Sequence, residues 1–242
     1  MPFSRLPQTL LWSASLALAM RAHAAPPAGT LGLVALPEVF GTQVCQPYKA
    51  DDIPLYAAPD DRAKGHVPIG RISVVKPMVL DAPGSCSGLE VQLLWADGKA
   101  SEEWPTEEYA NEEKGGIVLA RQGDMLKIAT DRAPAWIHRP GLRGFMPAST
   151  LLKEQLLELL ADLRPLARRA PGGASAQLAW QPKAASFLQA REVKGRLWLQ
   201  LEVHPQETCS FDITEASERA RVWVPFHDAK RRPTVWFYSR GC

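Results

Sequence analysis

Histidine is scarce in this sequence, and the short sequence motifs of common hydrolases are missing. The 242 residues include five histidines, and none of them lies in an H-E-x-x-H zinc motif. A G-x-S-x-G nucleophile elbow and a phosphate-binding P-loop are missing as well. These absences exclude the motif-bearing zinc proteases, serine hydrolases and nucleotide hydrolases. They favour a protein that is not an enzyme and that needs no cofactor.

Apolar runs long enough to span a bilayer are also missing beyond residue 24. Within residues 1–24, Arg5 precedes a short apolar stretch from Thr9 to Met20, and Ala22-His23-Ala24 is typical of a signal-peptidase site. The pattern predicts a signal peptide that is cut after Ala24. We therefore expect a periplasmic or secreted protein with no transmembrane segment.

Cysteine is limited to four residues, Cys45, Cys86, Cys209 and Cys242, all of them after the expected cleavage site. An even number of cysteines in an exported chain favours disulfides, although four cysteines allow three pairings. We expect Cys45–Cys86 and Cys209–Cys242, because this choice keeps each bridge within one half of the chain. No C-x-x-C pair is present, so we do not expect a metal site.

Net charge is small, but it is unevenly distributed. Residues 25–150 contain 12 Lys/Arg and 16 Asp/Glu, 12 − 16 = −4, whereas residues 151–242 contain 14 and 10, 14 − 10 = +4. Nucleic-acid binding needs a more strongly basic and clustered surface, so no nucleic-acid partner is expected. The opposite charges leave open a role as an inhibitor or chaperone-like partner of another secreted protein.

An acidic run covers residues 97–116. Its carboxylate pairs recur every five residues, which fits neither a helix nor a strand, and the spacing is not that of a calcium-binding loop. We interpret the run as a solvated insertion. The pairs are Glu102-Glu103, Glu107-Glu108 and Glu112-Glu113.

One helix and several short strands are predicted. Leucines at helical spacing indicate a helix at about 150–163, and Pro165 with the following Gly-rich stretch indicates a linker, so residues 151–174 are read as helix and linker. Short segments rich in β-branched and aromatic residues predict strands. These segments are 71–80, 89–95, 115–130, 195–203, 221–226 and 234–239.

Two stretches of the chain share a pattern. Each has a glycine turn, an alternating strand and a close of aromatic, aliphatic and proline residues, namely Phe145-Met146-Pro147 and Trp223-Val224-Pro225. The first stretch, with G-D-M-L-K-I at 123–128 and G-F-M-P-A-S-T-L-L at 144–152, resembles the ending of a bacterial SH3-like (SH3b) domain. The opening I-P-L-Y-A-A-P-D at 53–60 is similar to the first strand and loop of that family.

The second stretch, with G-R-L-W-L-Q-L at 195–201 and V-W-V-P at 222–225, resembles a more divergent copy. The resemblance implies a mostly β fold of two small SH3-like barrels joined by one short α-helix. The first would span residues 30–150, including the acidic insertion, and the second 175–242. It further implies a noncatalytic module of exported bacterial proteins that binds a cell-wall peptide or assists another envelope protein.

Aromatic side chains are the candidate ligand contacts. Alternation in the last predicted strand places Trp236 and Tyr238 on one face and Phe237 on the other. If Phe237 is buried, the opposite face forms an exposed strip for stacking of a peptide or sugar; if Trp236 is in the core, the strip disappears. The candidates are Tyr56, Trp136, Trp223, Trp236, Tyr238 and Arg240.

The last four residues suggest an enzymatic alternative. Ser239-Arg240-Gly241-Cys242 resembles the Ser-His-Gly-Cys motif of L,D-transpeptidases, with His227 upstream, although Arg240 stands where that motif has histidine. The alternative is therefore a cysteine-dependent peptidoglycan transpeptidase or hydrolase that uses Cys242 and His227. His227-Asp228 with His204 could also bind a metal, but a surface turn is the expected role.

Overall fold

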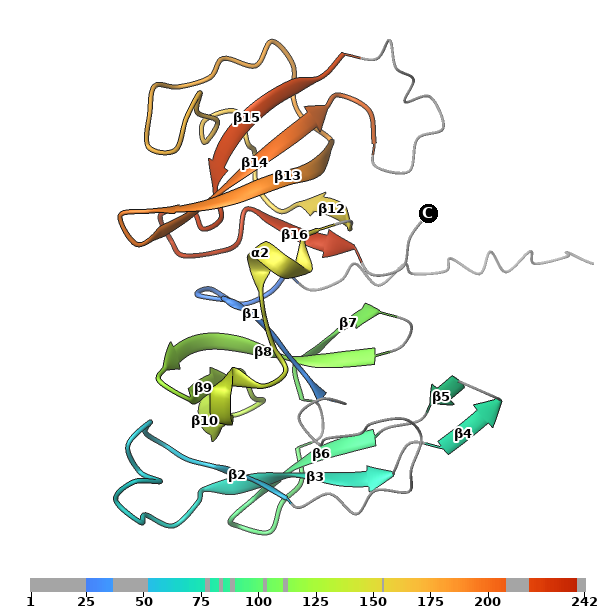
Figure 1. The fold of residues 1–242 in the computed structure, drawn as a ribbon, viewed down its shortest axis with the longest axis vertical. Coiled ribbons are helices and arrows are strands. Elements are labelled where there is room, and N and C mark those ends of the chain that lie inside the picture. The colour runs from blue at the N-terminus through green and yellow to red at the C-terminus, as the bar shows by residue number, and fades with distance from the viewer. Residues whose placement is uncertain are drawn as a thin grey trace, which may run out of the picture.

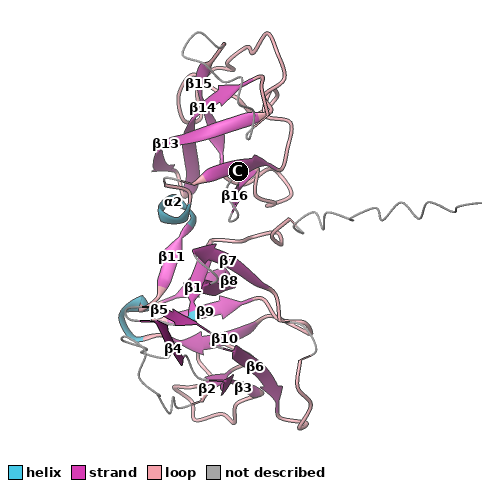
Figure 2. Ribbon diagram, turned by 90° about the vertical axis from the view of Figure 1, so that its right-hand side faces the viewer, coloured by secondary structure: helices cyan, strands magenta, loops and turns pink. Residues whose placement is uncertain are grey.

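The chain is mostly β, as predicted (Figure 2). The computed structural model describes residues 25–36, 52–76, 79–82, 85–87, 90–101, 104–110, 113–153, 155–207 and 218–238. No helix in this part of the chain is long and apolar enough to cross a membrane. The described strands gather into a lower and an upper group in Figure 1, which correspond to the two halves of the sequence.

A six-stranded antiparallel sheet forms the centre of the first half. Its main path is β10-β9-β8-β1-β11, and β7 pairs with β8 outside this path (Figure 1). A 3-10 turn, η1 (Pro140–Leu142), connects β10 to β11. The strands are β1 (Gly32–Ala35), β7 (Thr106–Ala110), β8 (Glu113–Gln122), β9 (Met125–Ile128), β10 (Ala135–His138) and β11 (Phe145–Pro147).

A three-stranded sheet, in the order β2-β3-β6, completes the core of the first half. Its strands are β2 (Ile53–Leu55), β3 (Gly70–Lys76) and β6 (Glu90–Trp95), and a separate hairpin comprises β4 (Val79–Ala82) and β5 (Ser85–Ser87). One face of this sheet packs against the six-stranded sheet. The shared buried residues are Val34, Ile53, Leu55, Ile72, Leu93, Trp95, Val118, Leu126, Ile128, Ala135 and Ile137.

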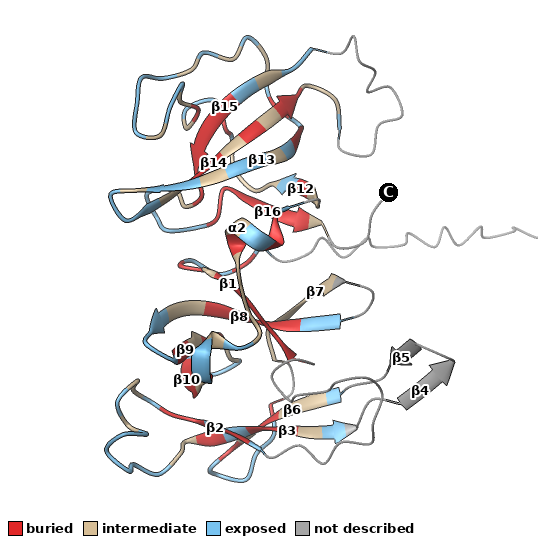
Figure 3. Cartoon of the chain, viewed as in Figure 1, coloured by how far each residue is buried: buried red, intermediate tan, exposed pale blue. Residues whose placement is uncertain are grey.

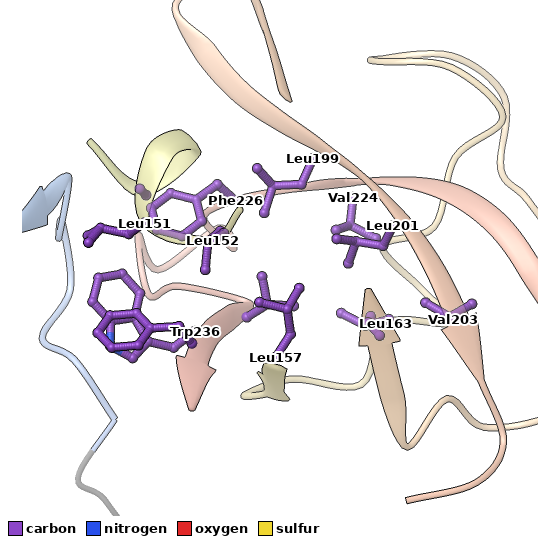
Figure 4. Close-up of a cluster of buried hydrophobic side chains, with 14 of the residues drawn as sticks. Leu151, Leu152, Leu157, Leu163, Leu199, Leu201, Val203, Val224, Phe226 and Trp236 are labelled. Atoms are coloured by element: carbon purple, nitrogen blue, oxygen red, sulfur yellow. The ribbon is translucent and has the colours of Figure 1, made fainter. Parts of the chain in front are cut away.

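A five-stranded antiparallel sheet forms the second half, in the order β15-β14-β13-β12-β16. Its inward-facing side chains make a second core, in which Leu199 and Val224 lie opposite Leu157 (Figure 4). Buried segments of β14, β15 and β16 enclose this core (Figure 3). The strands are β12 (Leu156–Leu159), β13 (Ala184–Val193), β14 (Arg196–His204), β15 (Ala220–Pro225) and β16 (Val235–Tyr238).

The two halves meet through apolar packing and backbone hydrogen bonds. Leu33 and Ile117 of the first half belong to the same buried cluster as Phe226 and Trp236 of the second. The helical turn α2 (Ala148–Leu151) also contributes to that cluster, and it lies between the two groups of strands in Figure 1. Wherever both side chains are described, each ion pair joins residues of one half. Between the described side chains, the opposite charges of the halves are thus paired within each half.

The predicted helix at 150–163 is wrong over most of its length. The helix α2 ends at Leu151, and the leucine-rich stretch that follows contains β12. In β12, Leu157 is fully buried and the next residue, Glu158, is exposed, which is the alternation of a strand. β12 pairs with β16, and the tertiary pairing outweighs the helical propensity of leucine.

The predicted strands are present, while the acidic run is only partly a loop. β3, β6, β8, β9, β14, β15 and β16 lie within or across the predicted segments. Part of the acidic run forms β7 and the start of β8, where Glu108 pairs with Lys114 across the hairpin. The expectation that the acidic run fits no strand is therefore wrong over β7 and the start of β8, while its interpretation as a solvated insertion stays a prediction. The sequence analysis also missed β13 as a separate strand.

Candidate ligand-binding groove

The outer face of the β2-β3-β6 sheet carries a groove. Alternation along β2 and β3 turns Ile53 and Ile72 inward, whereas Pro54 and Arg71 point outward. The groove has a volume of about 260 Å³. Its lining residues come from the sheet and the adjoining loops: Asp52, Pro54, Pro68, Gly70, Arg71, Leu94, Trp95 and Ala96.

Glycine at position 70 is required by the close approach of two strands. A Cβ atom at Gly70 would lie 2.6 Å from the carbonyl oxygen of Leu94 and 3.2 Å from the Cα of Trp95. Any side chain at this position would therefore push β3 away from β6, and the groove would lose its shape.

An ion pair lies at the edge of the groove. The Nε of Arg71 lies 2.8 Å from Oδ2 of Asp52, and both side chains are about half exposed, at 55% and 47%. The hydroxyl of Ser73 donates a hydrogen bond of 2.6 Å to the other oxygen, Oδ1 of Asp52. Because the Asp52 carboxylate is held by two partners, the groove presents one positive and one negative group at fixed positions.

Trp95 is a lining residue of the groove, although its side chain is only 8% exposed and belongs to the core, where it is held from two sides. Its indole N–H donates to the hydroxyl of Ser101 at 3.1 Å, and that hydroxyl donates to Oδ1 of Asp131 at 2.7 Å. The guanidinium of Arg132 lies 4.8 Å from the centroid of the Trp95 ring and pairs with Asp97 at 3.0 Å. These contacts fix the ring within the core of the first half, behind the strand that carries the outward-facing Leu94.

Asp97 is ionised in this arrangement. The backbone N–H of Lys99 and the guanidinium of Arg132 hold the pKa of Asp97 below its ordinary value. Asp97 pairs with Arg132 as Asp52 pairs with Arg71, and of these two pairs only Asp52–Arg71 lines the groove. The groove therefore combines apolar lining with paired charges, which suits a short peptide segment that carries a charged group.

Three of the predicted ligand contacts are core residues. Tyr56 and Trp136 are 8% and 9% exposed, and they pack with Met125. Trp223 is 7% exposed, and the guanidinium of Arg191 lies 5.9 Å from its ring centroid. None of these residues lines the groove.

The expected aromatic strip on β16 is not present in the described residues. Trp236 is 4% exposed and Phe237 is 5% exposed, so both faces of β16 are covered. The Trp236 ring lies 6.3 Å from that of Phe226, next to α2 (Figure 4). The physical reason is the contact between the halves, which buries the face of β16 that faces away from the core of the second half. Tyr238 is half-buried, and Arg240 lies outside the described residues.

The cysteine-based alternatives fall mostly outside the described residues. Cys45, Cys209 and Cys242 are not described, and Cys86 is described only as a backbone position in β5, so the expected disulfides remain predictions. The ring of His227 is half-buried, and its Nε2 lies 2.7 Å from the carbonyl oxygen of Thr30. His204 is buried in β14, and the described residues include no group of three potential metal ligands.

Comparison with known protein families, curated proteins and solved structures gives no match to this chain. Its function is therefore argued from its own residues. The sequence analysis missed Asp52, Arg71 and Leu94, which carry the chemistry of the groove. The available signal was the alternation in I-P-L and G-R-I, which places Pro54 and Arg71 on the outer face.

Proposed function

We propose that this chain is a non-enzymatic, exported binding or scaffold protein of the bacterial envelope, built from SH3-like modules. The groove on the β2-β3-β6 sheet is its ligand site, and a cell-wall peptide is the ligand. The observation that carries the proposal is the groove with the Arg71–Asp52 ion pair at its edge. The signal-peptide pattern of residues 1–24 supports the location.

The chemistry of the groove favours a peptide over an uncharged sugar. Pro54, Pro68 and Leu94 offer apolar contact, and Arg71 and Asp52 can each accept a ligand group of opposite charge. A cell-wall peptide carries carboxylate and amino groups on a short backbone, so it can pair with both residues at once. A charge-assisted hydrogen bond of this kind contributes about 1.5–3 kcal/mol.

The experiment that tests this proposal compares binding with turnover. We expect purified cell-wall sacculi to retain the protein, and we expect purified muropeptides to remain unchanged on incubation with it. The enzymatic alternative predicts turnover that Cys242→Ala abolishes and Cys209→Ala preserves. Turnover with that dependence on Cys242 would show that the protein is an enzyme. If sacculi fail to retain the protein, the proposed binding to the cell wall is wrong.

A further inference from the structure

Arg139 is a buried arginine without an acidic partner. It follows Ala135 and Ile137 on the inward-facing side of β10, and it is 8% exposed. Its Nε donates a hydrogen bond of 3.3 Å to the carbonyl oxygen of Arg143. Within the described part of the chain, no carboxylate forms an ion pair with it. By contrast, the exposed Arg232 has Asp228 at 2.8 Å.

Arg143 contributes the charge that acts on Arg139, and Asp124 lies across from Arg139, whose backbone N–H donates to the Asp124 carbonyl at 2.8 Å. Burial, together with the nearby charge of Arg143, lowers the pKa of Arg139, and Arg62 and Arg139 act in the same direction on His138, whose pKa is lowered chiefly by burial. Asp124 is the carboxylate whose charge acts on His138, and among the described residues it forms no ion pair with Arg139. A largely buried cation beside a second cation is stabilised by an anion that pairs with it.

The guanidinium of Arg139 keeps two donor groups available. The terminal nitrogens, Nη1 and Nη2, make no hydrogen bond to the described residues, and neither of them is among the fully buried atoms that lack a partner. The fork of the guanidinium therefore reaches solvent, while its stem is enclosed. This is the geometry in which arginine binds a carboxylate or phosphate with two parallel hydrogen bonds.

The loop over Arg139 has an unusual backbone. Gly141 has a φ of 61° and Leu142 has a φ of 56°, so two successive residues are left-handed, and one of them has a side chain. Leu142 donates its backbone N–H to the carbonyl of Arg139 at 2.8 Å, and Arg139 holds Arg143 through its Nε. A Cβ atom added at Gly141 would meet nothing within 4 Å, so the loop is open to solvent at its tip. Glycine adopts this conformation freely, so the strain lies at Leu142, and strained residues cluster at active sites, ligand clamps and switch regions.

We infer that Arg139, together with Arg143 and the loop that connects them, forms a binding site for an oxyanion, either a carboxylate or a phosphate group. The site lies beyond the end of β10 and shares no lining residue with the groove on the β2-β3-β6 sheet. It does not depend on the proposed peptide function. A purely structural role, in which Arg139 only clamps the loop through the Arg143 carbonyl, is the alternative that the experiment must separate.

The test measures thermal unfolding in sodium phosphate and in sodium chloride at equal ionic strength. We expect phosphate to raise the Tm of the wild-type protein by about 2–4 °C, the shift that about 1 kcal/mol of stabilisation gives at this chain length. Arg139→Met, which keeps the apolar stem and removes the charge, loses this shift, while the paired Arg232→Gln retains it. An equal shift in Arg139→Met, or none in the wild type, overturns the inference.

A second measurement applies even if Arg139→Met does not fold. The Nε–Hε signal of Arg139, assigned with Arg139→Lys, is followed by NMR during titration of the wild-type protein with inorganic phosphate. The same titration uses an acetylated dipeptide with a free terminal carboxylate, and its amide as the uncharged control. Movement with phosphate or with the free acid supports the site and identifies the source of the oxyanion. A signal that moves with neither, or that moves equally with the amide, contradicts it.

Discussion

The Nε2 of His227 lies 2.7 Å from the carbonyl oxygen of Thr30, although the two residues are 197 positions apart in the sequence. A carbonyl oxygen can only accept, so Nε2 carries a proton and its N–H donates a hydrogen bond to the Thr30 carbonyl. One residue earlier in the chain, Gly29 donates its backbone N–H to the carbonyl of Arg231 at 2.7 Å. These two bonds attach the segment before β1 to the turn before β16, and they hold the two halves of the chain together.

The burial of His227 predicts a loss of stability in acid. Burial holds the pKa of His227 below its ordinary value, even though the bond to Thr30 acts in the opposite direction. The unfolded chain, with a histidine pKa of about 6.5, then binds more protons than the folded chain below that pH. The contribution of the buried, neutral His227 to the free energy of unfolding is therefore complete above about pH 6.5, and it is lost as the pH is lowered towards 5.

Urea unfolding at a series of pH values checks this prediction. We expect His227→Gln, which retains a donor but does not titrate, to show a shallower fall in stability between pH 7 and pH 5. The pKa of His138 is also lowered by burial, so His138→Gln combined with His227→Gln should flatten the curve further. An unchanged pH profile in His227→Gln would show that the burial of His227 contributes nothing to the acid sensitivity.

Leu157→Ala tests the position of β12 in the second core. Leu157 is fully buried and pairs with Phe237, so its removal should lower the free energy of unfolding by about 2–5 kcal/mol. Leu188→Ala is the matched control, because Leu188 is 41% exposed and should change stability by less than about 0.5 kcal/mol. Equal effects of the two substitutions in chemical denaturation would contradict the assignment of Leu157 to a strand that faces the core.

Gly32→Ala tests the close pairing of β1 with β11 in the six-stranded sheet. A Cβ atom at Gly32 would lie 2.1 Å from the carbonyl oxygen of Met146, which is a backbone atom and cannot move aside without opening the β1–β11 pairing. We expect a loss of about 3 kcal/mol or more. Gly65→Ala is the control: Gly65 also has a positive φ, but it has free space around it, so the cost should be about 1–2 kcal/mol. A smaller loss for Gly32→Ala than for Gly65→Ala in thermal unfolding would mean that β1 and β11 are not this close.

The strands could be predicted where a single face is buried. In β14, Leu199, Leu201 and Val203 are buried and alternate with the partly exposed Gln200 and Glu202, so the period of two is visible in the sequence. In β12 the leucines satisfy the helical period as well. This segment forms a strand because it pairs with β16, which lies far along the chain, and local spacing cannot reveal that pairing.

The candidate site could be predicted less well, because it depends on contacts between elements. Alternation assigns Arg71 to an outer face, but its pairing with Asp52 depends on the register of β2 on β3. The burial of Trp236 could not be predicted from the sequence either. It results from packing against the first half and α2, and the pattern of β16 alone gave no reason to prefer the core over the surface.

Isothermal titration with a purified stem peptide measures whether the groove on the β2-β3-β6 sheet binds the proposed cell-wall ligand. The wild-type protein should show saturable binding, and Arg71→Gln should raise the Kd about tenfold or more, because one charge-assisted contact is lost. Arg221→Gln, which removes a similarly exposed arginine paired with Glu202 on the second half, should leave the Kd unchanged. Absence of saturable binding to the wild-type protein, or the same Kd in Arg71→Gln, would contradict the proposed binding.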